Sequence, residues 1–83
     1  MEEYVVYILF SKRFNKIYIG FTSSLIARFY SHNKLSKKGY TKKFRPWKVI
    51  HVEFYKSKRL ALIREKGLKS GQGRKFIREQ LIN

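Results

Sequence analysis

Residues 4–10 read Tyr-Val-Val-Tyr-Ile-Leu-Phe and residues 16–20 read Lys-Ile-Tyr-Ile-Gly, with a mostly polar stretch between them. Both segments are rich in β-branched and aromatic side chains, which is typical of β-strands. The intervening Ser-Lys-Arg-Phe-Asn at residues 11–15 favours a turn, so the segments predict a β-hairpin. A register with Phe10 opposite Asn15 also sets Tyr7 opposite Tyr18, and both phenols then lie on one face of the sheet.

The rest of the chain predicts one more strand and three helices. Residues 49–55 alternate apolar and polar side chains, which indicates the strand. The helices are expected at residues 22–33, at 58–69 after the N-cap candidate Ser57, and at 74–82 after a break at the Ser-Gly-Gln-Gly of residues 70–73. The expected fold is therefore α+β, a small three-stranded antiparallel sheet flanked by about three helices, in a single domain of residues 1–83.

The charge balance narrows the class of partner. The chain has 20 Lys and Arg against five acidic residues, all of them Glu, and a formal charge of +15. Such a charge attracts polyanions, so nucleic acid is the expected partner. The sequence has no long apolar run, signal-peptide pattern or lipidation motif, and a cytoplasmic, bacterial-type protein that can associate with the nucleoid is expected, with no membrane partner. Without cysteine, neither a disulfide nor a thiolate zinc site can form.

A basic segment at residues 34–48 interleaves cations with aromatic side chains. Bases can stack on the aromatic rings of such a segment while Lys and Arg neutralise phosphates. The alternative is a solvated charge run that keeps a small protein in solution. The residues expected to contact nucleic acid are Lys37, Lys38, Tyr40, Lys42, Lys43, Arg45 and Trp47, together with Arg74 and Lys75 at the start of the last expected helix.

The candidate catalytic residues are Tyr7, Tyr18, Arg28, His32 and Glu65. Arg28 and His32 are four residues apart and share one side of the first expected helix. Arg28 offers a fork of donors that matches phosphate oxygens, and Glu65 offers the hard oxygen that Mg²⁺ or Mn²⁺ prefers. A tyrosine, with an ordinary pKa of about 10, accepts a proton near neutral pH only where nearby cations favour the phenolate.

Each of these residues also has an ordinary structural explanation. Two tyrosines in strands are usually packing residues, and Arg28 with His32 can be a solvated helix edge. Glu65 can form an exposed i,i+4 ion pair with Lys69. It is the combination of the five residues, and not any one of them, that favours a site for phosphodiester cleavage.

The order and spacing of Val5-Val6-Tyr7, Tyr18-Ile19-Gly20, Arg28, His32 and Glu65 resemble the GIY-YIG nuclease domain. The resemblance covers nearly the whole chain and is to the small single-domain bacterial members, related to the N-terminal nuclease domain of UvrC. Two features depart from the family pattern. The first motif lacks its glycine, and the late Asn of larger members has no clear counterpart.

The resemblance implies a metal-dependent endonuclease that hydrolyses DNA, single-stranded or structured, in repair, recombination or defence. It implies one divalent ion, Mg²⁺ or Mn²⁺, held by Glu65, and a tyrosine, either Tyr7 or Tyr18, that takes the proton of the attacking water while His32 relays or positions. DNA is favoured over RNA, and a monomer or weak dimer is expected. Two alternatives remain: a nucleic-acid-binding module with weak or no catalytic activity, and a structural basic protein of a ribonucleoprotein.

Overall fold

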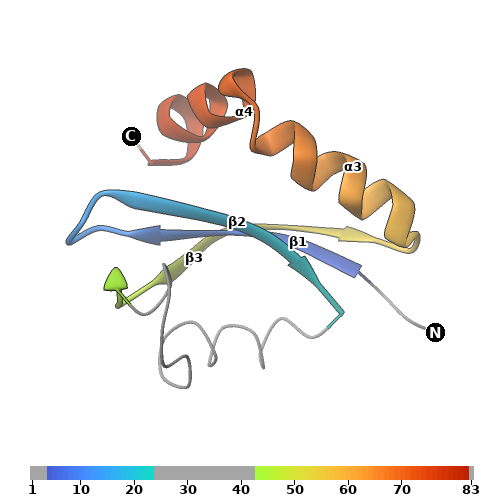
Figure 1. The fold of residues 1–83 in the computed structure, drawn as a ribbon, viewed down its shortest axis with the longest axis horizontal. Helices are drawn as coiled ribbons and strands as arrows, with labels where there is room; N and C mark the ends of the chain where they lie inside the picture. Colours follow the sequence, from blue (N-terminus) through green and yellow to red (C-terminus); the bar gives the residue numbers. More distant parts are fainter. Residues whose placement is uncertain (1–3, 24–42, 83) are drawn as a thin grey trace.

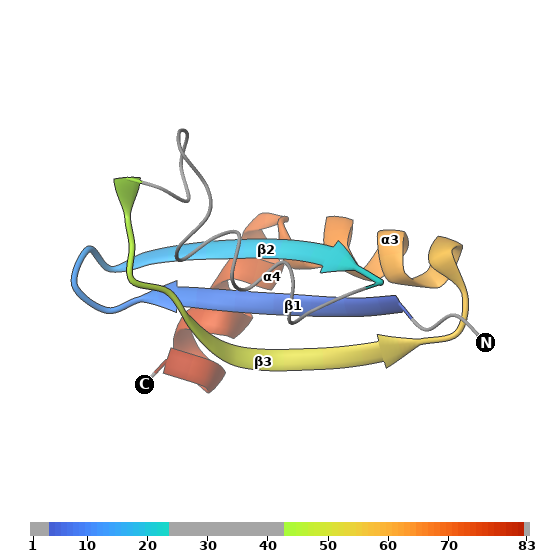
Figure 2. The same ribbon diagram turned by 90° about the horizontal axis from the view of Figure 1, so that it is seen from below.

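The computed structural model describes residues 4–23 and 43–82. Strands β1 (Tyr4–Ser11), β2 (Lys16–Thr22) and β3 (Lys48–Tyr55) form an antiparallel sheet in the order β2-β1-β3 (Figure 2). Helix α3 (Lys58–Leu68), helix α4 (Gly71–Phe76) and the π-helical turn η2 (Ile77–Ile82) follow. The predicted α+β fold is confirmed. The first expected helix, residues 22–33, lies outside the described residues apart from its first two, and Thr22 ends β2 instead.

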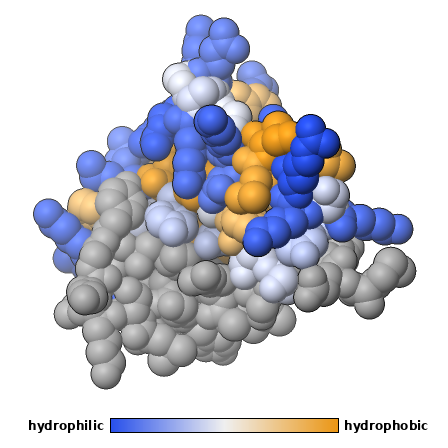
Figure 3. All heavy atoms as spheres, turned by 45° about the vertical axis from the view of Figure 1, so that its right-hand side comes forward, coloured by the Kyte–Doolittle hydropathy of each residue, from blue (hydrophilic) through white to orange (hydrophobic). Residues whose placement is uncertain are grey.

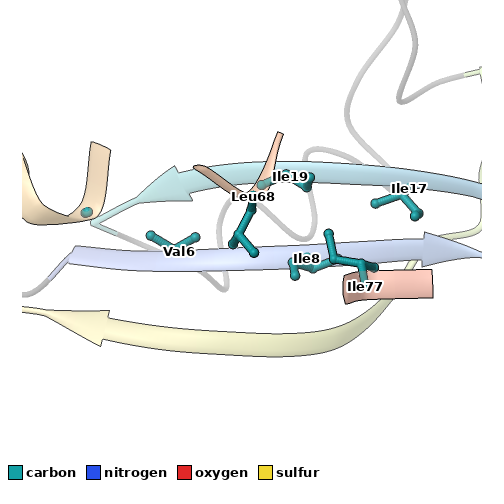
Figure 4. Close-up of a cluster of buried hydrophobic side chains, with 7 residues drawn as sticks. Val6, Ile8, Ile17, Ile19, Leu68 and Ile77 are labelled. Atoms are coloured by element: carbon teal, nitrogen blue, oxygen red, sulfur yellow. The ribbon is translucent and has the colours of Figure 1, made fainter. Parts of the chain in front are cut away.

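The central strand β1 is covered on both faces of the sheet. On one face, α3 and α4 lie across the strands (Figure 1), and Val6 and Ile8 pack there with side chains of β2 and the helices. Figure 4 shows this cluster, which consists of Val6, Ile8, Ile17, Ile19, Ala61, Leu68 and Ile77. On the other face, Tyr7 and Leu9 pack with Trp47. Burial on both faces explains why residues 4–10 are almost continuously apolar.

The hairpin register differs from the prediction by two residues. Ser11 pairs with Lys16, Leu9 with Tyr18 and Tyr7 with Gly20, so Tyr7 is not opposite Tyr18. The turn consists of residues 12–15 and ends at Asn15, whose φ of 54° lies in the left-handed region that Asn tolerates better than most residues. Ser11 therefore continues β1 and does not open the turn. Because the error is an even number of residues, every side chain keeps its predicted face.

Helix α3 begins where the sequence predicts, because the Ser57 hydroxyl accepts a hydrogen bond from the Leu60 amide at 3.3 Å. Helix α4 begins at Gly71, three residues before the expected start, and Ser70 is its N-cap. The glycines of this segment are therefore inside a helix and do not break the chain. Gly73 lies against the end of α3, where an added Cβ would come within 2.4 Å of the Gly67 carbonyl oxygen.

The last helical segment is tied to the hairpin turn. The Arg78 guanidinium donates to the side-chain oxygen of Asn15 and, at 3.1 Å, to its backbone carbonyl. This contact joins residues 63 positions apart. It places η2 over the end of the sheet that carries the turn.

The outer side of α3 has no covering element among the described residues. Leu60 and Ile63 are 53% and 56% exposed. Figure 3 shows apolar side chains at the surface between strongly hydrophilic ones. None of the described helices is apolar over a length that would cross a bilayer.

Candidate active site

The two candidate tyrosines lie together on the face of the sheet opposite α3. Their ring centroids are 6.3 Å apart with an interplanar angle of 28°. Trp47 makes an edge contact with Tyr18 at 6.2 Å between centroids. Tyr7 is buried, with 2% of its surface exposed, whereas Tyr18 is only partly buried. Tyr18 is therefore the tyrosine of this pair that a ligand can reach.

Gly20 makes room for the Tyr7 ring. The two residues are register partners in β1 and β2. A Cβ added at Gly20 would lie 2.6 Å from the Tyr7 hydroxyl oxygen and 2.7 Å from the ring carbon that carries it. Real Cβ atoms do not approach so closely, so the glycine of Tyr18-Ile19-Gly20 is needed for the position of Tyr7. It is not a turn residue before a helix, because it lies inside β2.

Glu65 belongs to the helix layer on the other side of the sheet (Figure 1). Its side chain is 18% exposed, and Lys69 Nζ donates to its Oε2 at 3.3 Å. The ion pair considered as the ordinary explanation of Glu65 is thus present. The side chain is nevertheless mostly buried, so the pair is not the fully solvated one that this explanation requires.

A shallow pocket at the edge of the sheet links these two layers. It has a volume of about 370 Å³ and is lined by Ile17, Tyr18, Ile19, Lys69 and Arg74. Because β2 is the edge strand, its outer side gives access both to Tyr18 on one face and to the helix residues on the other. Lys69 is the link, since it lines this pocket and also binds Glu65.

The cations at this edge have different surroundings. Arg74 lines the pocket and donates from Nε to the Lys69 carbonyl at 3.3 Å. Lys75, also predicted to contact nucleic acid, is 4.0 Å from Glu79 and points into solvent. Lys69 was not among the predicted site residues. Its i,i+4 spacing to Glu65 predicts only a surface ion pair. That Lys69 lines the same pocket as Tyr18 depends on tertiary packing.

The remaining predicted residues divide into two groups. Lys43 is exposed with its ammonium group 5.4 Å from the Phe44 ring centroid, and Arg45 is partly buried close to Trp47 in the chain. Arg28, His32, Lys37, Lys38, Tyr40 and Lys42 lie outside the described residues. Within residues 4–23 and 43–82, no three side chains of the His, Cys, Asp or Glu type gather in a group that could hold a metal.

Glu65 is compatible with a single divalent ion of the predicted kind. Its Oε1 has no hydrogen-bond partner in the described part of the chain, and Oε2 is bound only by Lys69. A hard cation needs about six oxygen ligands, so one carboxylate must be supplemented by water and by substrate phosphate. These donors fit a site that becomes complete only with the substrate.

A second carboxylate, Glu53, which the sequence did not single out, joins β3 to α3. Arg64 Nε and Nη2 donate to its two oxygens at 2.9 and 3.1 Å. The Tyr55 hydroxyl donates to Oε1 at 2.7 Å, and His51 Nε2 lies 2.8 Å from Oε2. The polar side chains of the third strand therefore face the helices. The alternation of residues 49–55 revealed the strand but gave no sign of a partner for Glu53.

The acidity of Glu53 reflects these contacts. Burial raises the pKa of its carboxyl, but hydrogen bonds from Arg64, His51 and Tyr55 outweigh burial, and the pKa falls from 4.5 to about 2. The hydrogen bond to Glu53 raises the pKa of the Tyr55 phenol. Arg64 directly precedes Glu65, so this network holds the helix turn that carries the candidate metal ligand.

The Glu53 network makes stability depend on acid pH. The pKa of Glu53 is lower in the folded state, so its contribution is complete above about pH 4.5 and is lost as the pH falls towards 2. We expect the free energy of unfolding, measured by urea titration, to fall over this range. Glu53→Gln should show a shallower fall, whereas Glu79→Gln, an exposed control, should follow the wild type. Equal slopes for all three proteins would contradict the role of Glu53.

A methyl group at Gly20 should displace Tyr7. We expect Gly20→Ala to lower the free energy of unfolding by about 1–3 kcal/mol, as overpacking does. Gly67→Ala is the control, because a Cβ there meets nothing within 4 Å and helix propensity favours Ala by about 1 kcal/mol. Denaturant unfolding measures both, and aromatic NMR shifts report Tyr7. A Gly20→Ala protein as stable as the wild type with unshifted tyrosine resonances would show that the close approach is absent.

Comparison with known proteins agrees with the sequence pattern. Residues 3–77 match the GIY-YIG catalytic domain. A UPF0213 protein of Staphylococcus haemolyticus is 36% identical over 82 residues, which cover 99% of this chain and 93% of the relative. A UPF0213 protein of Limosilactobacillus reuteri is 38% identical over 66 residues, covering 77% of this chain and 68% of the relative.

A solved structure is similar as well. The solution structure of a UPF0213 protein from Bacillus halodurans matches with a TM-score of 0.55 and 25% identity, over 90% of this chain and 81% of the other. Together with the match over residues 3–77, and with the stacked Tyr7 and Tyr18 beside Gly20, these similarities show that the chain belongs to the GIY-YIG family.

Proposed function

We propose that this protein is a metal-dependent endonuclease that hydrolyses phosphodiester bonds of DNA at the outer edge of β2. Family membership suggests a nuclease. The observation that carries the proposal is the edge pocket, in which Tyr18 lies with Lys69 and Arg74 while Lys69 also binds Glu65. A phosphate between two cations, beside a phenol and near a carboxylate, meets the requirements of phosphodiester hydrolysis.

Burial supports separate roles for the two tyrosines. Tyr18 lines the pocket, so we assign it the proton of the attacking water. Tyr7 is 2% exposed and stacks on Tyr18, so we assign it the positioning of the Tyr18 ring.

Charge on the phosphate is neutralised by the cations in this proposal. Lys69 and Arg74 hold the non-bridging oxygens, and Arg28 adds the bidentate donors for which its fork is suited. His32 relays or positions a proton. A divalent ion, Mg²⁺ or Mn²⁺, would be held by Glu65 with water and phosphate, where it would stabilise the developing negative charge. With Glu65 so engaged, Lys69 would be free to bind the phosphate.

The charge of +15 supports a polyanionic substrate, which we take to be DNA. We place its action in the cytoplasm, in repair, recombination or defence. A binding module without catalytic activity would use the same charge and fold. The two functions differ in whether Glu65 matters, because one carboxylate contributes little to the affinity of so basic a chain for DNA.

The Glu65 carboxylate should be needed for cleavage and not for binding. We expect Glu65→Gln to reduce Mg²⁺- or Mn²⁺-dependent cutting of labelled single-stranded, duplex and branched DNA by about 100-fold or more, with DNA affinity unchanged or slightly raised. Glu79→Gln is the matched control, because the Glu79 side chain is 54% exposed, and this variant should cut DNA normally. Binding without cutting by the wild type in any metal would assign the protein to the binding-module class.

The hydroxyl groups of Tyr7 and Tyr18 should contribute unequally to the cleavage rate. Tyr18→Phe should lower the cleavage rate by roughly 100-fold or more, because general-base catalysis is lost while the ring remains. Tyr7→Phe should have a smaller effect, because its hydroxyl is buried. Single-turnover rates of both variants, with circular dichroism as a folding control, test this order. A larger loss in Tyr7→Phe would reverse the assignment of the two tyrosines.

A further inference from the structure

A second pocket lies at the end of the sheet that carries the hairpin turn. Its volume is about 580 Å³. It is lined by Phe10, Lys12, Arg13, Pro46, Trp47, Lys48, Ile50, Leu81 and Ile82. These residues come from the end of β1, the turn, the segment before β3, the start of β3, and η2. The Arg78–Asn15 contact joins the turn to η2.

The walls of this pocket are apolar and its rim is cationic. Phe10, Trp47 and Ile50 contribute to the apolar walls. Lys12, Arg13 and Lys48 are exposed, and none of them forms a salt bridge with a described residue. Arg13 lies 5.3 Å from the Phe14 ring centroid. Each of the three carboxylates of the described residues is engaged by a cation elsewhere, so none of these carboxylates neutralises the charge of the rim.

Trp47 connects this pocket to the candidate active site. Trp47 is 3% exposed and is one of the residues that line the pocket, and its ring contacts Tyr18 at 6.2 Å between centroids. A group bound in this pocket is therefore separated from Tyr18 by the side chain of Trp47.

The ligand that fits these surroundings combines a flat apolar group with adjacent negative charge. A nucleobase with its flanking phosphates has this form, since bases stack on aromatic side chains while Lys and Arg hold the backbone. Bases inside a duplex are already stacked and paired, so only an unpaired nucleotide can enter. An acidic peptide with one apolar side chain offers charge without the flat ring, and the aromatic walls favour the base.

We propose that this pocket binds an unpaired nucleobase of single-stranded DNA, next to the phosphate that lies at Tyr18, and that Lys12, Arg13 and Lys48 hold the neighbouring phosphates. The proposal rests on the proposed function and specifies the class of substrate. DNA with a single-stranded end, gap or flap is then preferred over fully paired duplex.

Trp47 is the single tryptophan of the chain, so its fluorescence reports on the pocket directly. The full chain carrying Glu65→Gln is titrated with a short oligothymidylate, with the same oligonucleotide containing a central run of abasic sites, with a duplex, and with polyglutamate. We expect quenching by oligothymidylate, and a loss of most of this quenching with the abasic strand and the duplex. Equal quenching by the abasic strand, or stronger quenching by polyglutamate, would overturn the proposal.

A matched pair of charge variants tests the rim. Lys12→Ala with Lys48→Ala removes two charges at the pocket, and Lys56→Ala with Lys58→Ala removes two exposed charges at the opposite end of β3. General electrostatic attraction is weakened equally in both. We expect the preference for single-stranded over duplex DNA to fall roughly fivefold or more only in the first variant. An equal change in both variants would show that the pocket is not a specific site.

The two proposals fail in different ways. If wild-type protein cuts no DNA but oligothymidylate still quenches Trp47, the endonuclease proposal is wrong and the base pocket stands. If the wild type cuts single-stranded and duplex DNA equally, and Glu65→Gln stops this cutting while the Lys12→Ala with Lys48→Ala variant cuts normally, the nuclease stands and the pocket proposal is wrong. Melting temperatures of all variants show whether each is folded.

Discussion

The burial of β1 on both faces of the sheet fixes the position of every other described element. Val6 and Ile8 face α3 and α4, and Tyr7 and Leu9 face Trp47, so the strand supplies two cores at once. A chain of 83 residues without disulfides has little other means of stability. One consequence is functional. The same strand holds Tyr7 in place, and Tyr7 in turn packs against Tyr18.

The sheet also separates the candidate catalytic groups. The tyrosines lie on one face and Glu65 is carried by the helix on the other, so their chemistry can meet only around the outer edge of β2. The pocket at this edge, with Lys69 between Tyr18 and Glu65, is consistent with that requirement. The Glu53–Arg64 contact fixes the helix turn next to Glu65. This ion pair positions α3 on the sheet, and it therefore also positions Glu65.

The end of the sheet that carries the hairpin turn has a basic and aromatic surface. At the hairpin end, basic side chains surround aromatic and aliphatic ones, with Lys16 and Lys43 close to the Phe44 ring and Phe14 packed against Phe44 at 5.5 Å. Cations beside exposed aromatic rings form the surface that single-stranded nucleic acids recognise. Lys43 and Phe44, from the described part of the predicted basic and aromatic segment, thus lie beside Phe14 and Lys16 of the hairpin, which are remote from them in sequence.

The strands, the main helix, the charge and the family pattern could be predicted from the sequence, because periodicity, capping residues and motif spacing act over a few residues. The sequence also determined that Tyr7 and Tyr18 share a face, since a register error of two residues leaves side-chain direction unchanged. The strand register, the pairing of Arg64 with Glu53, and the difference between buried Tyr7 and partly buried Tyr18 could not be predicted in this way. These depend on contacts between segments far apart in the chain, and the two pockets at Tyr18 and Trp47 arise in the same way.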